Sequence, residues 1–217
     1  MPSDRTPAKS ALAERRGKPS HRDDLRNELL AEAVKVVAAD GHEGLSIRKL
    51  AEAIGVSPAA PYNHFPDRRS LLLAVALEGY IRMFDETGSG MPDPDDADED
   101  ASPERLFQSF VAFIRFAMTQ PHLFTLMYES ELVRPMLAPE LGEAQDRGFQ
   151  FLRREIARLA PDLNEHERSV RVATIWSAVF GFAMQANRAM LRHQAPEPAP
   201  HDLAPEVVRQ ALRLLAA

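Results

Sequence analysis

Apolar residues recur at steps of three and four positions along nearly the whole chain, which is the spacing of one face of a helix. The first such run covers residues 25–37, and Gly41 after it is able to end a helix in a left-handed conformation. Turn-rich segments in which apolar and polar residues alternate, the mark of strands, are absent. The pattern therefore predicts an all-α protein of about nine helices.

Two short helical runs separated by a tight turn lie within residues 47–65. Ser46 offers a cap for the first run, Gly55 tolerates the backbone conformation of the turn, and the small Ala51 lets the two helices cross closely. Pro61 predicts that the second helix begins late or is partly 3₁₀, because proline is tolerated only in a first helical turn. This spacing predicts a helix-turn-helix unit whose second helix enters the major groove of DNA.

The side chains around the second run favour DNA binding over a helical hairpin inside a core, which shows similar spacing. Hydrogen-bonding side chains occupy the run itself, and basic side chains flank it where phosphates would lie. The residues that we expect to contact DNA are Arg48, Ser57, Pro58, Ala59, Ala60, Tyr62, Asn63, His64 and Arg68.

Charge is distributed unevenly along the chain. The formal net charge of -6 by itself argues against a nucleic-acid binder, but residues 1–22 carry six basic and two acidic side chains. Residues 87–102 contain no basic residue and are rich in glycine, proline and aspartate, which predicts an acidic, flexible loop. We expect residues 1–22 to form a basic, flexible arm near a polyanion, although a solvated tail without a partner has the same composition.

Several other classes of protein are disfavoured. The absence of cysteine excludes disulfides, thiolate metal sites and cysteine nucleophiles, and it fits a reducing cytoplasm. No apolar run is long enough to cross a membrane, and none near the first residue resembles a secretion signal. The histidines lack metal-ligand spacing, and no nucleophile stands in a motif with a recognisable base. We therefore expect a cytoplasmic protein without catalytic residues, metal or cofactor.

Residues 25–72 resemble the DNA-binding domain of the TetR family of repressors. The resemblance rests on an amphipathic first helix, an alanine-rich second helix, the turn Gly55-Val56-Ser57, and Tyr62 and Phe65 ahead of a basic residue. It implies that the third helix enters the major groove, and that Arg68 begins the fourth helix beside the phosphates. The sequence departs from the family pattern at two positions, with Pro61 in place of an aliphatic residue and Arg68 in place of a lysine.

The implied organisation is a helix-turn-helix domain at residues 23–70, followed by a ligand-binding and dimerisation domain at residues 71–217. The second domain resembles its family counterpart mainly in its number of helices. Trp176 and Gly181 match the Trp-His-Gly signature of one C-terminal subgroup, with Phe180 in place of the histidine. Residues 172–184 carry no charge, which predicts burial on all sides, by the core and by a partner subunit.

Aromatic and methionine side chains are concentrated in the helices of the second domain. At helical spacing such side chains usually form plain core, but they also line apolar ligand cavities. We expect a ligand between the helical runs at residues 102–118, 139–159 and 164–193, with Gly181 leaving room for it. The expected contacts are Phe110, Phe113, Ile114, Phe124, Met127, Phe149, Trp176, Phe180 and Met184.

The sequence thus predicts a repressor that binds double-stranded operator DNA as a homodimer and is released by a small apolar or aromatic effector. One alternative is an architectural protein that binds DNA without regard to sequence, and comparing specific with random duplex would separate the two. An all-α enzyme is the less favoured alternative.

Overall fold

The computed structural model describes residues 21–86, 102–133, 139–193 and 200–215. Within these ranges every regular element is a helix, as the apolar spacing predicts. Eight are α-helices rather than about nine, because the second run of the helix-turn-helix unit forms a 3₁₀ helix. Residues 1–20 of the predicted arm and residues 87–101 of the predicted loop lie outside the described residues.

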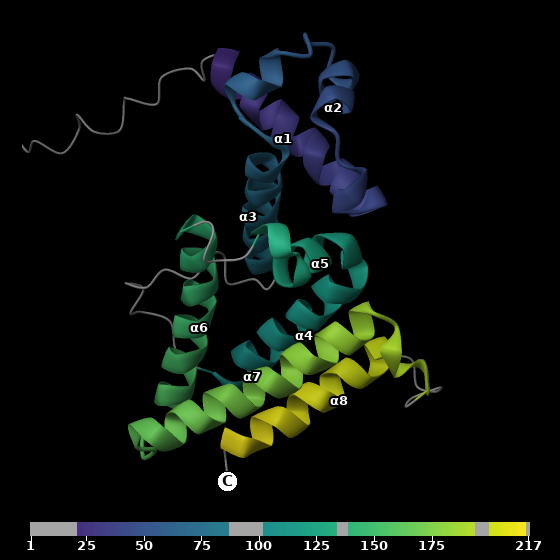
Figure 1. The fold of residues 1–217 in the computed structure, drawn as a ribbon. Helices are drawn as coiled ribbons and strands as arrows, with labels where there is room; N and C mark the ends of the chain where they lie inside the picture. Colours follow the sequence, from purple (N-terminus) through teal and green to yellow (C-terminus); the bar gives the residue numbers. More distant parts are fainter. Residues whose placement is uncertain (1–20, 87–101, 134–138, 194–199, 216–217) are drawn as a thin grey trace, which may run out of the picture.

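The eight α-helices lie in two groups joined by one long helix (Figure 1). They are α1 (His21–Asp40), α2 (Ile47–Ala53), α3 (Arg68–Glu86), α4 (Pro103–Thr119), α5 (Pro121–Glu129), α6 (Pro139–Leu159), α7 (Glu165–Asn187) and α8 (Pro200–Leu212). The 3₁₀ helices are η1 (His42–Gly44), η2 (Ala60–Asn63), η3 (Glu131–Val133), η5 (Met190–His193) and η6 (Arg213–Leu215).

Local sequence signals explain where several helices begin. The Ser46 hydroxyl accepts a hydrogen bond from the Lys49 amide at the start of α2, and Ser102 caps α4 in the same way. At the start of α7, the Asn164 side chain accepts from the Glu167 amide at 3.0 Å, and the Glu167 carboxylate accepts from the Asn164 amide at 2.9 Å. This reciprocal pair satisfies amides that would otherwise lack partners in the first turn.

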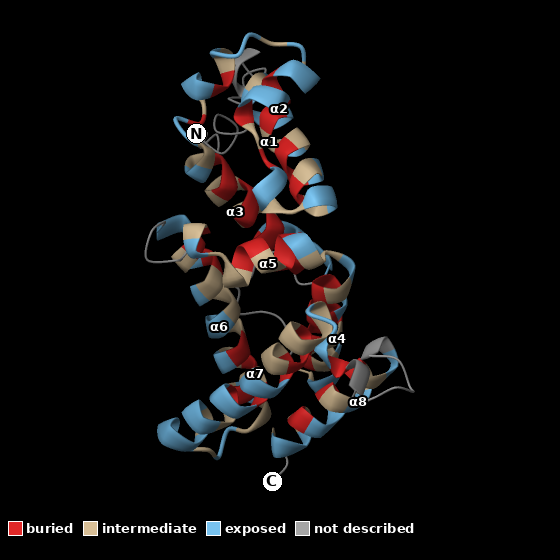
Figure 2. Ribbon diagram, turned by 45° about the vertical axis from the view of Figure 1, so that its right-hand side comes forward, coloured by how far each residue is buried: buried red, intermediate tan, exposed pale blue. Residues whose placement is uncertain are grey.

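The helix α3 connects the two groups. It packs against α1 in the first group and, at 19 residues, is about 28 Å long. The predicted domain boundary at residue 70 therefore falls in its first turn. A Cβ atom added at Gly79 would lie 2.6 Å from the Met127 sulfur, so this glycine permits a close approach of α3 and α5. Buried positions continue from α1 through α3 and α5 (Figure 2), so α3 has packed neighbours in both groups.

The second group places α4 against α7 and α8, with α6 crossing beside α3 and α7 (Figure 1). None of the helices in the described ranges is both long and apolar enough to span a bilayer. In the same ranges, histidine and carboxylate side chains form no group of three or more that could hold a metal ion.

Candidate DNA-binding surface and ligand cavity

The turn between α2 and η2 depends on Gly55. Its φ of 75° lies in the left-handed region, which other residues adopt at a cost. A Cβ atom added there would meet nothing within 4 Å, so backbone conformation rather than lack of space favours glycine. The turn is closed by a hydrogen bond of 3.0 Å from the Val56 amide to the Ala51 carbonyl. The chain therefore leaves α2 at a fixed angle.

The element after this turn is the 3₁₀ helix η2, preceded by turn residues 58 and 59. Its hydrogen bonds span three residues, as from the Tyr62 amide to the Ala59 carbonyl at 3.3 Å and from His64 to Pro61 at 3.0 Å. The prediction of a late or 3₁₀ helix is confirmed. Pro61 is buried, and its nitrogen carries no hydrogen, so it cannot donate the backbone hydrogen bond of an ordinary α-helix.

The residues predicted to contact DNA divide into an exposed and a half-buried set. Tyr62 is 52% exposed, so its ring and its hydroxyl are accessible to a partner. Ala60, His64 and Arg68 are half-buried. The exposed members of the set are Arg48, Ser57, Pro58, Ala59, Tyr62 and Asn63. They give η2 and the turn before it a mixed polar and aromatic face beside the basic start of α2.

Two side chains at this end of the molecule differ from expectation. The exposed Arg26 of α1 lies with its guanidinium carbon 5.3 Å from the ring centroid of the buried Phe65. Sequence reasoning missed this basic side chain because the periodicity of α1 indicates only that it is exposed. Arg68 donates from Nε to the Leu45 carbonyl at 3.0 Å and from a terminal nitrogen to the His42 carbonyl. Arg68 therefore ties α3 to the segment between α1 and α2, and a phosphate contact by it stays a prediction.

Replacing Arg68 with alanine is expected to lower the free energy of unfolding by about 1 to 3 kcal/mol, because two backbone carbonyls lose a charged donor. Arg48→Ala is the matched control. The Arg48 side chain is 79% exposed and forms an ion pair with Glu52 one turn away, so its loss should leave stability nearly unchanged. Urea unfolding of both variants measures the difference. Equal stability of the two would show that Arg68 has no such structural role.

A cavity of about 220 Å³ lies in the second group of helices. Its walls come from α3, α4, α5, α6 and α7, and among the described residues no charged side chain lines it. The lining consists of Tyr80, Met83, Phe84, Ser109, Phe110, Phe113, Tyr128, Gln145, Gly148, Phe149, Phe151, Leu152, Trp176 and Phe180. A designed cavity of about 150 Å³ takes up benzene, so this space suits a ligand of one to two rings.

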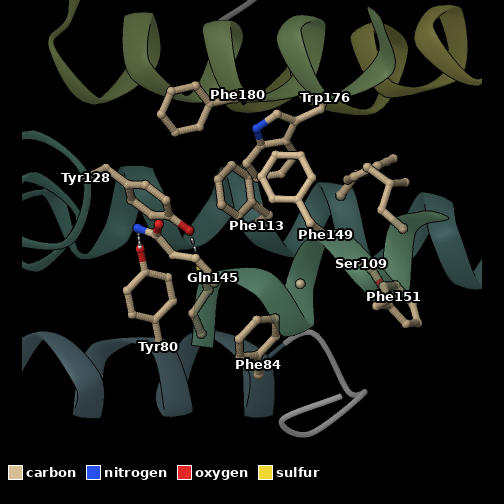
Figure 3. A pocket seen from close by; sticks show the side chains of 14 residues that line it. Tyr80, Phe84, Ser109, Phe113, Tyr128, Gln145, Phe149, Phe151, Trp176 and Phe180 are labelled. Atoms are coloured by element: carbon tan, nitrogen blue, oxygen red, sulfur yellow. Dashed lines mark hydrogen bonds between the residues drawn. The ribbon is translucent and has the colours of Figure 1, made fainter. Parts of the chain in front are cut away.

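Aromatic rings form the middle of the lining (Figure 3). The Trp176 ring stacks on Phe180 at a centroid distance of 5.5 Å and lies 5.2 Å from Phe113 and 5.5 Å from Phe149. These offset and edge contacts are the favoured geometries of aromatic pairs. Trp176 is the only tryptophan of the chain, so its fluorescence reports directly on the cavity.

The polar groups of the lining lie toward its two ends (Figure 3). At one end the Gln145 amide donates to the Tyr80 hydroxyl at 2.6 Å. Burial raises the pKa of Tyr80 to about 12, and burial raises that of Tyr128 well above its ordinary value, so both phenols stay neutral at physiological pH. At the other end Ser109 lies beside Phe151, and its buried hydroxyl has no hydrogen-bond partner within the described part of the chain.

Five of the predicted ligand contacts line the cavity: Phe110, Phe113, Phe149, Trp176 and Phe180. The other four, Ile114, Phe124, Met127 and Met184, do not. Ile114 follows Phe113 and therefore points about 100° further around α4, where it is fully buried in the core. Phe124 and Met127 lie in the core of α5, with Met127 against Gly79 of α3. Met184, one turn past Phe180, packs on the core.

The expected role of Gly181 is wrong. A Cβ atom added at Gly181 would meet nothing within 4 Å, and the residue is not part of the cavity lining. It lies on the same face of α7 as Ser177 and Ala178, which are exposed. Sequence reasoning also missed the contribution of α3 and most of that of α6. Gly148 of α6 is the glycine that borders the cavity, where an added Cβ would meet the Phe84 ring at 3.3 Å.

Comparison with known proteins finds a family match for each of the two parts of the molecule. Residues 29–75 match the family described as bacterial regulatory proteins of the tetR family, and residues 106–215 match a Tetracyclin repressor-like C-terminal domain. The transcriptional repressor AcnR of Corynebacterium glutamicum is 43% identical over 58 residues, which are 27% of this chain and 31% of that protein. The matched segment therefore spans less than a third of the length of AcnR.

Two further relatives extend over most of the chain. The nucleoid occlusion factor SlmA of Vibrio vulnificus is 25% identical over 185 residues, covering 82% of this chain and 91% of that one. A solved structure of a protein with unknown function from Rhodococcus sp. RHA1 has a TM-score of 0.72 and 28% identity, covering 93% of this chain and all of that one.

Proposed function

Because the chain belongs to the TetR family of regulatory proteins, we propose that it is a cytoplasmic, sequence-specific repressor released from operator DNA by a small apolar or aromatic ligand. The observation that carries the proposal is the course of α3. Its first residue, Arg68, donates a hydrogen bond to the segment between α1 and α2, and its later turns line the cavity with Tyr80, Met83 and Phe84. One rigid element therefore contacts both the DNA-binding surface and the ligand.

Release would follow from a shift of α3. A ligand that changes the position of Tyr80 or Phe84 changes the direction of α3. The hydrogen bonds from Arg68 to the His42 and Leu45 carbonyls carry that change to the segment that leads into α2, and so to the helix-turn-helix unit. In a dimer this alters the separation of the two recognition elements and so their fit to two half-sites. The coupling is reciprocal: a ligand that weakens operator binding tenfold, or about 1.4 kcal/mol, is itself bound tenfold more weakly by the operator complex.

A second copy of the chain is the partner that the outer face of α7 suits. This face bears Val170, which is 50% exposed, and the exposed small residues Ala173, Thr174, Ser177 and Ala178. The face carries no charge from residue 172 to residue 184, as the sequence indicates, and Arg171 lies at its edge beside Val170. The helix α8 packs along α7 and supplies the other helix of the pair. Two such pairs would form a four-helix bundle about a two-fold axis.

The DNA-binding part of the proposal is tested at η2. Tyr62→Ala and Asn63→Ala should each weaken binding to the operator by about 1 to 3 kcal/mol if the side chain contacts a base edge, while affinity for random duplex changes little. Gln150→Ala, an exposed residue of α6 far along the chain from η2, is the control and should change neither. Equal affinity of the unmodified protein for operator and random duplex would favour the architectural alternative.

A further inference from the structure

Ser109 of α4 is a buried polar residue whose hydroxyl lacks a hydrogen-bond partner among the described residues. Its side chain is buried, with an exposed fraction of 8%, and its hydroxyl oxygen has no hydrogen-bond partner within the described part of the chain. Serine in a helix commonly bonds back to a carbonyl of the preceding turn, as the Thr119 hydroxyl of the same helix does to Arg115 at 3.0 Å. The Ser109 hydroxyl makes no such bond, and Ser109 is one of the residues that line the cavity.

We propose that the ligand of this cavity is an uncharged, flat aromatic molecule carrying a hydroxyl or carbonyl group, and that Ser109 hydrogen-bonds this group. The inference rests on the proposed ligand-dependent function and specifies the chemistry of the same cavity. An unpaired buried hydroxyl costs free energy, and a ligand that pairs with it recovers that cost on binding.

The other lining residues determine the shape and size of the ligand. The rings of Phe113, Phe149 and Trp176 present aromatic faces and edges, which favour a flat aromatic partner over a branched aliphatic one. A volume of about 220 Å³ limits the molecule to one or two rings. At the far end, the Tyr80 hydroxyl already accepts from Gln145 and the Tyr128 hydroxyl donates to the Met83 sulfur, whereas the Ser109 hydroxyl has no partner within the described part of the chain.

The lining also decides the charge of the ligand. Among the described residues that form it there is no lysine, arginine, histidine, aspartate or glutamate, and both tyrosines stay neutral because burial raises their pKa. An ionised ligand would lose its hydration shell without gaining an opposite charge. A neutral hydroxyl or carbonyl needs only one hydrogen bond, which Ser109 supplies as donor or acceptor.

Three probes that differ in one group test this inference on the full-length protein: naphthalene, 2-naphthol and 2-naphthoate. Binding is followed by Trp176 fluorescence and by calorimetry. The unmodified protein should bind 2-naphthol about three to ten times more tightly than naphthalene, the gain of one neutral hydrogen bond. It should bind 2-naphthoate at least about ten times more weakly than 2-naphthol.

Ser109→Ala should abolish the preference for 2-naphthol over naphthalene without weakening naphthalene, and should not lower Tm, because no hydrogen bond within the protein is lost. Ser169→Ala, an exposed serine of α7, is the matched control and should keep the preference. Equal affinity for naphthalene and 2-naphthol, a preference that survives Ser109→Ala, or tightest binding of 2-naphthoate overturns this inference alone. Failure of all three probes to bind overturns it together with the ligand-dependent part of the proposed function.

Discussion

Ala178→Glu is expected to convert a dimeric protein into monomers and to weaken operator binding by at least about tenfold. Ala178 is exposed on the outer face of α7, within the uncharged residues 172–184, where we propose that a second copy packs. Two-fold symmetry would bury two carboxylates without partners, at a cost of several kcal/mol. A monomer presents one recognition element, so the second half-site contributes nothing to affinity.

Sedimentation velocity measures this result, with Gln150→Glu as the control. Gln150 is exposed on α6, which is not one of the two helices of the proposed interface, so the same added charge should leave the dimer intact. Leu212→Glu in α8 should act like Ala178→Glu, because Leu212 lies half-buried in the other helix of the pair. A stable monomer for the unmodified chain, or a dimer that persists in Ala178→Glu, would refute the proposed interface.

Gly148→Leu is expected to weaken ligand binding by at least about tenfold while the protein stays folded. Gly148 borders the cavity, and a side chain there occupies space that the ligand needs. A Cβ atom would meet the edge of the Phe84 ring at 3.3 Å, so that ring must shift by a few tenths of an ångström. Leucine has the higher helix propensity by about 1 kcal/mol, which offsets this contact.

Fluorescence of Trp176 during titration with 2-naphthol measures the loss, and operator affinity with and without 2-naphthol shows whether the response is lost too. Gln150→Leu adds the same side chain on the exposed face of α6 and should leave both unchanged. If Gly148→Leu binds 2-naphthol as tightly as the unmodified protein does, the ligand does not occupy this cavity.

The helix-turn-helix unit was predictable because its shape depends on local rules. A left-handed turn requires a residue such as Gly55, and Pro61 forbids an ordinary helix around it, so both the turn and the 3₁₀ form of η2 follow from neighbouring residues. The structural role of Arg68 was not predictable in this way. Its hydrogen-bond acceptors, the His42 and Leu45 carbonyls, lie 26 and 23 positions away along the chain.

The cavity was predictable only in part, for a related reason. Helical periodicity and the concentration of aromatic residues indicate which residues are buried, so Phe113 and Trp176 could be listed as candidate contacts. It does not show where packed helices leave space. That space depends on the approach of α6 to α3, which Gly148 and Phe84 determine, and on which of two neighbouring buried residues, such as Phe113 and Ile114, faces it. Gly181 likewise faces open space because of the side of α7 on which it lies, which its small size does not reveal.

Selection of bound DNA from a pool of random duplexes tests whether this chain recognises a specific sequence, because it needs no knowledge of the operator. We expect enrichment of a near-palindromic sequence with half-sites about one helical turn apart or somewhat more, bound by the dimer. We also expect Tyr62→Ala to enrich this sequence less strongly than the unmodified protein does. A pool that stays random after repeated rounds with the unmodified protein would contradict the claim that this chain is a sequence-specific repressor.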